Sequence, residues 1–159
     1  ILFFEHKYMY RSIKGPVPDN NYNIDIGKAD IKKEGKDLTV ITYGMGVHWM
    51  LNMSDKLKNK NIDVEILDLR SLIPWDKELV KKSISKTNRV LILHEANLTG
   101  GIGAEISAYI SENCFQLLDA PVMRLGAIDT PVPFSSELEG EIYLPINKIE
   151  QKINELINF

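Results

Sequence analysis

Cysteine is scarce in this chain of 159 residues, where Cys114 is the one example. A single cysteine excludes a disulfide within the chain, and such scarcity fits a reducing compartment. No zinc-binding pattern is present either, because His6 and His48 have no metal-ligand partner at a usable spacing. Cys114, which lies beside Phe115 in a segment with helical periodicity, is best interpreted as a small buried hydrophobe.

Long apolar runs and blocks of basic charge are also missing. No apolar stretch reaches the roughly 18 residues of a membrane-spanning helix. No basic region precedes an apolar one at the start, so we expect no signal peptide. The lysines are scattered among acids and the formal net charge is −3, so nothing attracts the chain to a phosphate backbone. We therefore expect neither a membrane nor nucleic acid as a partner.

What the chain does have is a regular alternation of short apolar runs and helix-period segments. Strands are expected at 38–43, 62–69, 90–93 and 122–125, with a weaker edge strand within 25–33. Helices are expected after Gly46, after a capping Asp76, over about 101–118 and over 147–157. Strand–helix–strand order implies right-handed crossovers and parallel neighbours. The predicted fold class is α/β, a three-layer α/β/α sandwich with a mostly parallel sheet whose weak edge strand is free to run antiparallel.

Two details of this prediction can be checked directly against a structure. The apolar stripe Ile102, Ile106, Ile110 and Phe115 is expected to face the core from the helix at 101–118. The run Ile1–Phe4 is strand-like and has no initiator Met, so we expect it to be the last strand of a preceding domain.

The expected domain boundary follows from the residues after that run. Gly15, Pro16 and Pro18 make a segment that holds neither a helix nor a central strand. We expect residues 1–11 to end a preceding domain, residues 12–24 to be a linker, and residues 25–159 to form the α/β domain.

Gly44-x-Gly46 after the first confident strand resembles the start of a dinucleotide fingerprint. Asp68, at the end of the next strand, lies where a ribose ligand would fall. However, Trp49 occupies the place of the third glycine, where a bulky side chain obstructs the helix–strand packing that the motif needs. We favour a tight strand-to-helix turn over nucleotide binding.

The stretch after Val90 carries the candidate functional residues, because partners and ligands gather outside the carboxyl ends of parallel strands. His94 and Glu95 are adjacent on a strand, so they point to opposite faces and do not form an acid–base pair on one atom. The turn with Gly100, Gly101 and Gly103 could offer amides to an anion, but it contains no Lys or Arg to complete a phosphate site. We favour a subunit interface made by His94, Glu95 and these three glycines.

The same stretch also carries a family resemblance. The segments HEANLTGGIGAEISAYISENCF, LDAPVMRLGAIDTPVPF, YNIDIGKADIKKEGKDLTVITYG and DLRSLIPWD resemble the C-terminal domain of the beta subunit of thiamine-diphosphate-dependent 2-oxoacid dehydrogenases. This is the transketolase C-terminal-like domain, and the resemblance covers nearly the whole chain in one order. Within the family, HEANLTGG and SLIPWD are most similar to the branched-chain 2-oxoisovalerate enzymes. The pyruvate and acetoin enzymes remain the alternatives.

The resemblance implies that residues 1–11 end the pyrimidine-binding domain of a larger enzyme that uses thiamine diphosphate and magnesium. In the family, a Gly-Asp-Gly segment on the alpha subunit holds the diphosphate and its magnesium, and a glutamate of the preceding domain activates the thiamine ring. Neither is found in this chain, so we expect no catalytic, cofactor-binding or metal-binding residue here. The implied compartment is the bacterial cytoplasm or the mitochondrial matrix.

The implied partners are the alpha subunit, a second beta subunit across a two-fold axis, and the dihydrolipoamide acyltransferase core. The core docks in some complexes through a small basic binding domain, which Asp119 and the carboxylate of Phe159 would attract. Glu137, Glu139 and Glu141 would add to that acidic field, although a merely solvated acidic face is the alternative. A stand-alone interaction domain and a nucleotide-binding domain are the other functions we weigh.

Overall fold

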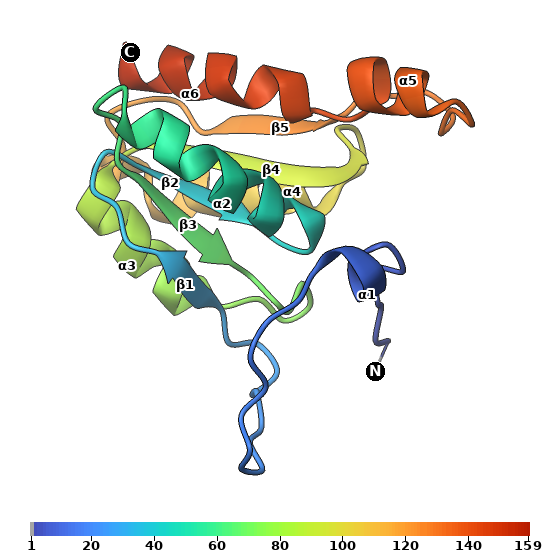
Figure 1. Ribbon diagram of the computed structural model, residues 1–159. Helices are drawn as coiled ribbons and strands as arrows, with labels where there is room; N and C mark the ends of the chain where they lie inside the picture. Colours follow the sequence, from blue (N-terminus) through green and yellow to red (C-terminus); the bar gives the residue numbers. More distant parts are fainter. Residues whose placement is uncertain (1) are drawn as a thin grey trace.

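The computed structural model describes residues 2–159, and the side chains of all of these except 141 and 142. Among these residues, five strands form one sheet in the order β1-β3-β2-β4-β5 (Figure 1). The strands are β1 (Asp30–Lys33), β2 (Leu38–Thr42), β3 (Val64–Asp68), β4 (Val90–Asn97) and β5 (Met123–Ala127). Strands β2 to β5 are parallel to one another, and β1 pairs with β3 antiparallel at one edge. The mostly parallel sheet and its antiparallel edge strand agree with the sequence-based prediction.

Helices cover both faces of the sheet. The longer helices are α2 (Met45–Lys58), α3 (Lys77–Thr87), α4 (Ile102–Asn113) and α6 (Ile149–Ile157). The shorter ones are α1 (Met9–Ser12), η1 (Phe115–Leu117), α5 (Ser136–Leu138), the π-helix η2 (Glu139–Tyr143) and η3 (Ile146–Lys148).

Successive strand residues point to opposite faces, and each face contributes to its own apolar cluster. On one face Val40, Ile66 and Leu93 pack with α2 and α6. On the other face Ile41 and Ile92 pack with α3 and α4. The three-layer α/β/α sandwich predicted from the sequence is therefore confirmed.

Local sequence signals account for several helix ends. The carboxylate of Asp76 accepts a hydrogen bond from Leu79 N at 3.0 Å, which makes it the N-cap of α3 as predicted. Asn88 ends the same helix in the left-handed conformation that asparagine tolerates. Glu150 of α6 forms ion pairs with Lys56 of α2 and with Lys60, which follows that helix. These two contacts lower the pKa of Glu150 to about 2.

One detail of the prediction was wrong. Phe115 is 73% exposed, because α4 ends at Asn113 and the chain turns into η1, so that Cys114 takes the buried position instead. Leu2–Phe4 are exposed and form no strand within this chain, and their expected place in the last strand of a preceding domain stays a prediction. Ile1, which belonged to the same predicted strand, lies outside the described residues.

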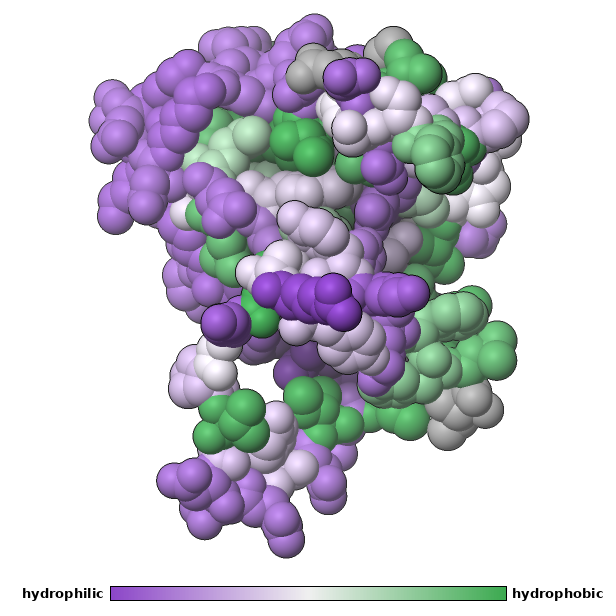
Figure 2. All heavy atoms as spheres, turned by 45° about the vertical axis from the view of Figure 1, so that its right-hand side comes forward, coloured by the Kyte–Doolittle hydropathy of each residue, from purple (hydrophilic) through white to green (hydrophobic). Residues whose placement is uncertain are grey.

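Residues 2–29, the N-terminal arm, run outside the sheet before β1 (Figure 1). The exposed fractions of Leu2, Phe3 and Phe4 are 84–85%. The space-filling view shows apolar surface gathered on the side where the arm lies, next to a mostly polar body (Figure 2). The boundaries of a preceding domain and a linker within this arm stay a prediction.

Candidate functional site

Strand β4 does not end before the polar pair but continues through His94 and Glu95 to Asn97. The side chain of His94 is fully buried on the same side of the sheet as Ile92, under α4. Its ring stacks on Tyr43 of the neighbouring strand end, with ring centroids 6.4 Å apart. The predicted interface residue His94 therefore lies inside this chain.

Three glycines make the space that the imidazole of His94 occupies. A Cβ on Gly101, Gly103 or Gly126 would lie 2.9, 2.5 or 2.7 Å from the nearest ring atom, closer than any real Cβ contact. Gly101 and Gly103 thus have a role within the chain, in addition to the subunit contact predicted for them. Gly126, which the sequence analysis missed, comes from β5. Gly100 is different, because it is exposed and turns the chain with a φ of +75°.

The hydrogen bonds of His94 define its protonation state. Its Nδ1 lies 2.9 Å from the carbonyl oxygen of Ala96, which only accepts, so Nδ1 carries the proton. Its Nε2 is buried and has no hydrogen-bond partner among the described residues. Burial, and secondarily the charge of Arg124, lower the pKa of His94. A buried neutral imidazole of this kind cannot reach a substrate, so it does not serve as a general acid or base here.

Glu95 points the other way and pairs with the N-terminal arm. Its carboxylate lies 3.0 Å from Nε2 of His6, 89 residues earlier in the chain. The expectation that His94 and Glu95 point to opposite faces is confirmed. The sequence analysis missed His6, because nothing near it in the sequence marks its partner.

The Gly44-x-Gly46 segment has structural reasons for both glycines. Gly44 has a φ of +56°, and a Cβ on Gly46 would lie 2.1 Å from Oγ1 of Thr42. Trp49 is a core residue of α2. Asp68 accepts a hydrogen bond from the backbone of Arg70 at 3.2 Å, and burial raises its pKa. This geometry favours the tight turn over a ribose site.

The segment DLRSLIPWD binds the end of the N-terminal arm to the sheet. The guanidinium of Arg70 donates to the carbonyls of Lys28 at 3.1 Å and Ala29 at 2.9 Å. Ser71 accepts from Gly27 N at 2.9 Å, and the carboxylate of Asp76 accepts from Ala29 N at 3.2 Å. The motif, used above only as a family signature, therefore positions the chain as it enters β1.

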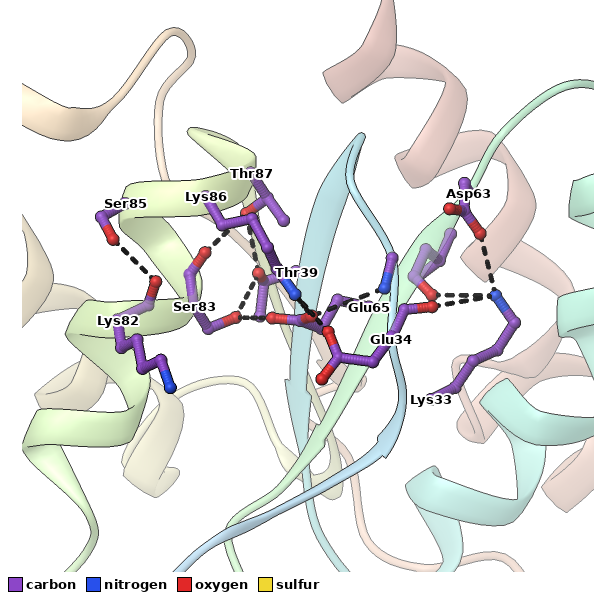
Figure 3. A network of polar contacts seen from close by, with 12 residues as sticks. Lys33, Glu34, Thr39, Asp63, Glu65, Lys82, Ser83, Ser85, Lys86 and Thr87 are labelled. Carbon is purple, nitrogen blue, oxygen red and sulfur yellow. Dashed lines mark hydrogen bonds and ion pairs between the residues drawn. The ribbon is translucent and has the colours of Figure 1, made fainter.

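A buried polar network under α3 was also missed (Figure 3). Glu65 of β3 is fully buried and receives hydrogen bonds from Ser83 and Lys86. The hydroxyl of Ser83 has one proton and donates it to Glu65, so in the contact between Ser83 and Thr39 the donor is Thr39. In the contact between Thr39 and Thr87 the donor is then Thr87. The signal in the sequence was Glu65, an acid between the apolar residues Val64 and Ile66 of an expected strand. The network satisfies the hydrogen-bonding needs of a carboxylate buried inside the sheet.

The two predicted docking residues lie at the amino end of the strands. Asp119 is exposed and lies 3.6 Å from Arg89, whose Nε donates to the carbonyl of Leu156 near the end of α6. Phe159, also exposed, follows that helix end. Arg89 therefore links the surroundings of both residues, although the sequence analysis did not single it out.

The acids predicted to strengthen that surface are elsewhere. Glu137 and Glu139 lie on α5 and η2, at the opposite end of α6 from the C-terminus (Figure 1). The side chain of Glu141 lies outside the described residues. Glu137 and Glu139 therefore lie apart from Phe159, and their contribution to an acidic field around that residue stays a prediction.

The described residues bring together no set of side chains that fits thiamine diphosphate and magnesium. In the part of the chain that the structure describes, no group of three His, Cys, Asp or Glu side chains could hold a metal ion. A shallow hollow of about 690 Å³ on α6 is lined by Asn, Gln and the acids Glu150 and Glu155, with no base to meet a diphosphate. We derive no catalytic step through the cofactor. Nor is any helix among the described residues long and apolar enough to cross a membrane.

The sheet, its two helical layers and the intrachain contacts at its carboxyl end define an α/β/α sandwich domain with an antiparallel edge strand. Residues 27–149 match the family model for the transketolase, C-terminal domain, and the chain belongs to that family.

Known proteins similar to this chain agree with that assignment. The 2-oxoisovalerate dehydrogenase subunit beta of Bacillus subtilis (strain 168) is 44% identical over 100% of this chain and 49% of its own length. The pyruvate dehydrogenase E1 component subunit beta of the same organism is 40% identical over 93% of this chain and 45% of its own. A solved structure of a split gene transketolase, an inactive beta4 tetramer, superposes with a TM-score of 0.75 at 25% identity, covering 92% of this chain and 46% of that one. The chain thus spans about half the length of the curated relatives it matches.

Proposed function

We propose that this chain is the C-terminal assembly part of the beta subunit of a 2-oxoacid dehydrogenase that acts on branched-chain 2-oxo acids. The observation that carries the proposal is the 44% identity to a 2-oxoisovalerate dehydrogenase beta subunit across the entire chain. The 40% identity to a pyruvate dehydrogenase beta subunit and the 45% identity to an acetoin:2,6-dichlorophenolindophenol oxidoreductase subunit beta keep pyruvate and acetoin as the alternative substrates. The kcat/KM values for a branched-chain 2-oxo acid, pyruvate and acetoin, measured on the assembled enzyme, decide between them.

In this proposal the chain contributes contacts and no cofactor ligand. The enzyme as a whole uses thiamine diphosphate and magnesium to remove CO2 and pass the acyl group to a lipoyl arm, and the alpha subunit and preceding domain supply the ligands. Support comes from the described residues, which bring no metal-ligating group together. The compartment is the bacterial cytoplasm or the mitochondrial matrix, where enzymes of this class work.

The proposed subunit contact lies at the carboxyl end of the sheet. Glu95 and Gly100 reach the surface there, while His94, Gly101 and Gly103 shape the turn from within. The similar split transketolase is described as a beta4 tetramer, which supports contacts between copies of such a domain. Sedimentation of a Gly100→Asn variant, whose Asn tolerates the positive φ, tests whether this surface meets a second beta subunit.

The proposed docking site for the acyltransferase core is the surface of Asp119 and Phe159. We expect Asp119→Asn, or removal of residues 158–159, to weaken binding of the small basic binding domain about tenfold or more. Each change removes an acidic or apolar contact from a basic partner. Titration calorimetry with the purified binding domain measures the effect, and circular dichroism checks that the fold is intact.

Glu137→Gln is the matched control, because it removes the same charge at the other end of α6. We expect that variant to bind like the unchanged chain. Unchanged affinity of the Asp119→Asn chain would show that no part of this surface attracts the core. An equal loss of affinity in the Glu137→Gln chain would show that a diffuse acidic field attracts it.

A further inference from the structure

The turn at residues 97–103 packs on one buried ring, in addition to the hydrogen bonds that Leu98 and Thr99 make to Ala127 and Asp129. The imidazole of His94 fills the space between β4, β5 and the start of α4, where a Cβ on Gly101, Gly103 or Gly126 would collide with the ring. Removing or repelling this ring would take away the side chain on which Gly101 and Gly103 pack.

We propose that His94 is a proton-operated latch that holds this turn and the start of α4 closed while its Nε2 carries no proton. The Nδ1–H group is already committed to the carbonyl of Ala96. A second proton on Nε2 would face Gly103 and the first turn of α4, where the described residues offer no acceptor. It would also place a positive charge at the end of a helix that already carries partial positive charge.

The charged groups around the ring do not compensate such a charge. Tyr43, directly after strand β2, stacks on the ring. Strand β5 presents Arg124, whose charge repels an imidazolium. The Nη1 of Arg124 also donates to the carbonyl of Leu98 in the same turn at 3.1 Å. Glu95, the next residue of β4, is paired with His6. Helix α4 meets the ring with glycines, and its first-turn acid Glu105 is exposed.

The direction of the pH effect follows from these contacts. Burial and Arg124 lower the pKa of His94 in the folded chain from its ordinary value of 6.5. The folded state therefore binds fewer protons than the open state, so the latch is fully effective above pH 6.5. Its effect is lost as pH falls below that value toward the folded pKa. Over that window the open fraction of the turn rises at most about tenfold per pH unit.

Because the turn carries Gly100 and Gly101, acid would also loosen the subunit contact proposed above. That consequence rests on the proposed function, whereas the latch itself does not. A measurement on the isolated chain therefore separates the two.

The decisive experiment is two-bond nitrogen–proton NMR of the histidine rings, combined with hydrogen exchange of residues 97–106 between pH 7.5 and 5.5. We expect His94 to show the Nδ1–H tautomer at pH 7.5. Exchange of the turn, corrected for the intrinsic effect of pH, should accelerate about tenfold at pH 5.5. His94→Phe fills the socket with a ring that cannot be protonated, so it should remove the acceleration. His6→Gln, which breaks only the neighbouring pair with Glu95, should retain it.

An Nε2–H tautomer at neutral pH would overturn the proposal, as would an acceleration that survives His94→Phe or disappears in His6→Gln. The tautomer is read on the unchanged chain, so the test holds even if the phenylalanine variant fails to fold.

Discussion

Gly35→Ala should unfold at a markedly lower urea concentration than the unchanged chain. A Cβ at this position would lie 2.2 Å from the backbone nitrogen of Glu65 and 2.2 Å from the carbonyl carbon of Val64. Both are backbone atoms of β3 and cannot rotate away. The turn before β2 would have to lift off the strand and lose the hydrogen bonds that Lys36 and Asp37 donate to the carbonyl of Asp63. We expect a loss of about 3 kcal/mol, the upper end of what overpacking costs.

The control for this prediction is Gly15→Ala in the N-terminal arm. A Cβ there would meet nothing within 4 Å, so the change in stability should stay within about 0.5 kcal/mol. Urea unfolding followed by tryptophan fluorescence measures both variants. Equal midpoints for the two would mean that the turn at residues 34–37 does not pack on β3 as described.

Lys86→Met should be the second severe change, because it leaves the buried carboxylate of Glu65 without its cation. The side chain of Lys86 is 40% exposed, while that of Glu65 is fully buried. Burial works against the charge on Lys86, but hydrogen bonds to Glu34 and Glu65 outweigh it and raise the pKa of Lys86. Removing the lysine alone should lower the free energy of unfolding by about 3 kcal/mol, because it leaves a charged carboxylate buried where water reaches it less easily than the lysine.

A double-mutant cycle assigns this loss to the pair. Glu65→Gln with Lys86→Met removes both charges and keeps an oxygen to accept from Ser83, so it should recover about 2 kcal/mol of the loss. Glu34→Gln removes the other, exposed partner of Lys86 and should change the midpoint only slightly. Additive single changes would contradict a direct interaction between Glu65 and Lys86.

Most of the fold could be predicted because its signals are local. Runs such as 38–42 are apolar and β-branched, and the helices repeat apolar residues at helical spacing, so periodicity alone separated strands from helices. The ends of elements were harder. Phe115 was assigned to the core because its spacing continued that of α4, yet the helix had already ended at Asn113. A cap without a side-chain hydrogen bond leaves little trace in the sequence.

The candidate site was less predictable because its contacts are distant in the sequence. The position of His94 was found, but its role depends on Gly126, which reaches it through the pairing of β4 with β5. Arg70 and the carbonyls it binds are 41 and 42 residues apart, and His6 and Glu95 are 89 residues apart. No local pattern marks such pairs. The distance of Glu137 from Phe159 could not be read from the sequence either, because it depends on how α6 lies.

We propose that this chain contributes contacts to an enzyme whose cofactor is held by other parts. Calorimetric titration with thiamine diphosphate and Mg²⁺ tests it directly, with the assembled alpha and beta subunits as the positive control. We predict saturable binding to the assembled enzyme, and none to this chain tighter than about 1 mM. Saturable one-to-one binding of the cofactor by this chain alone would contradict the account.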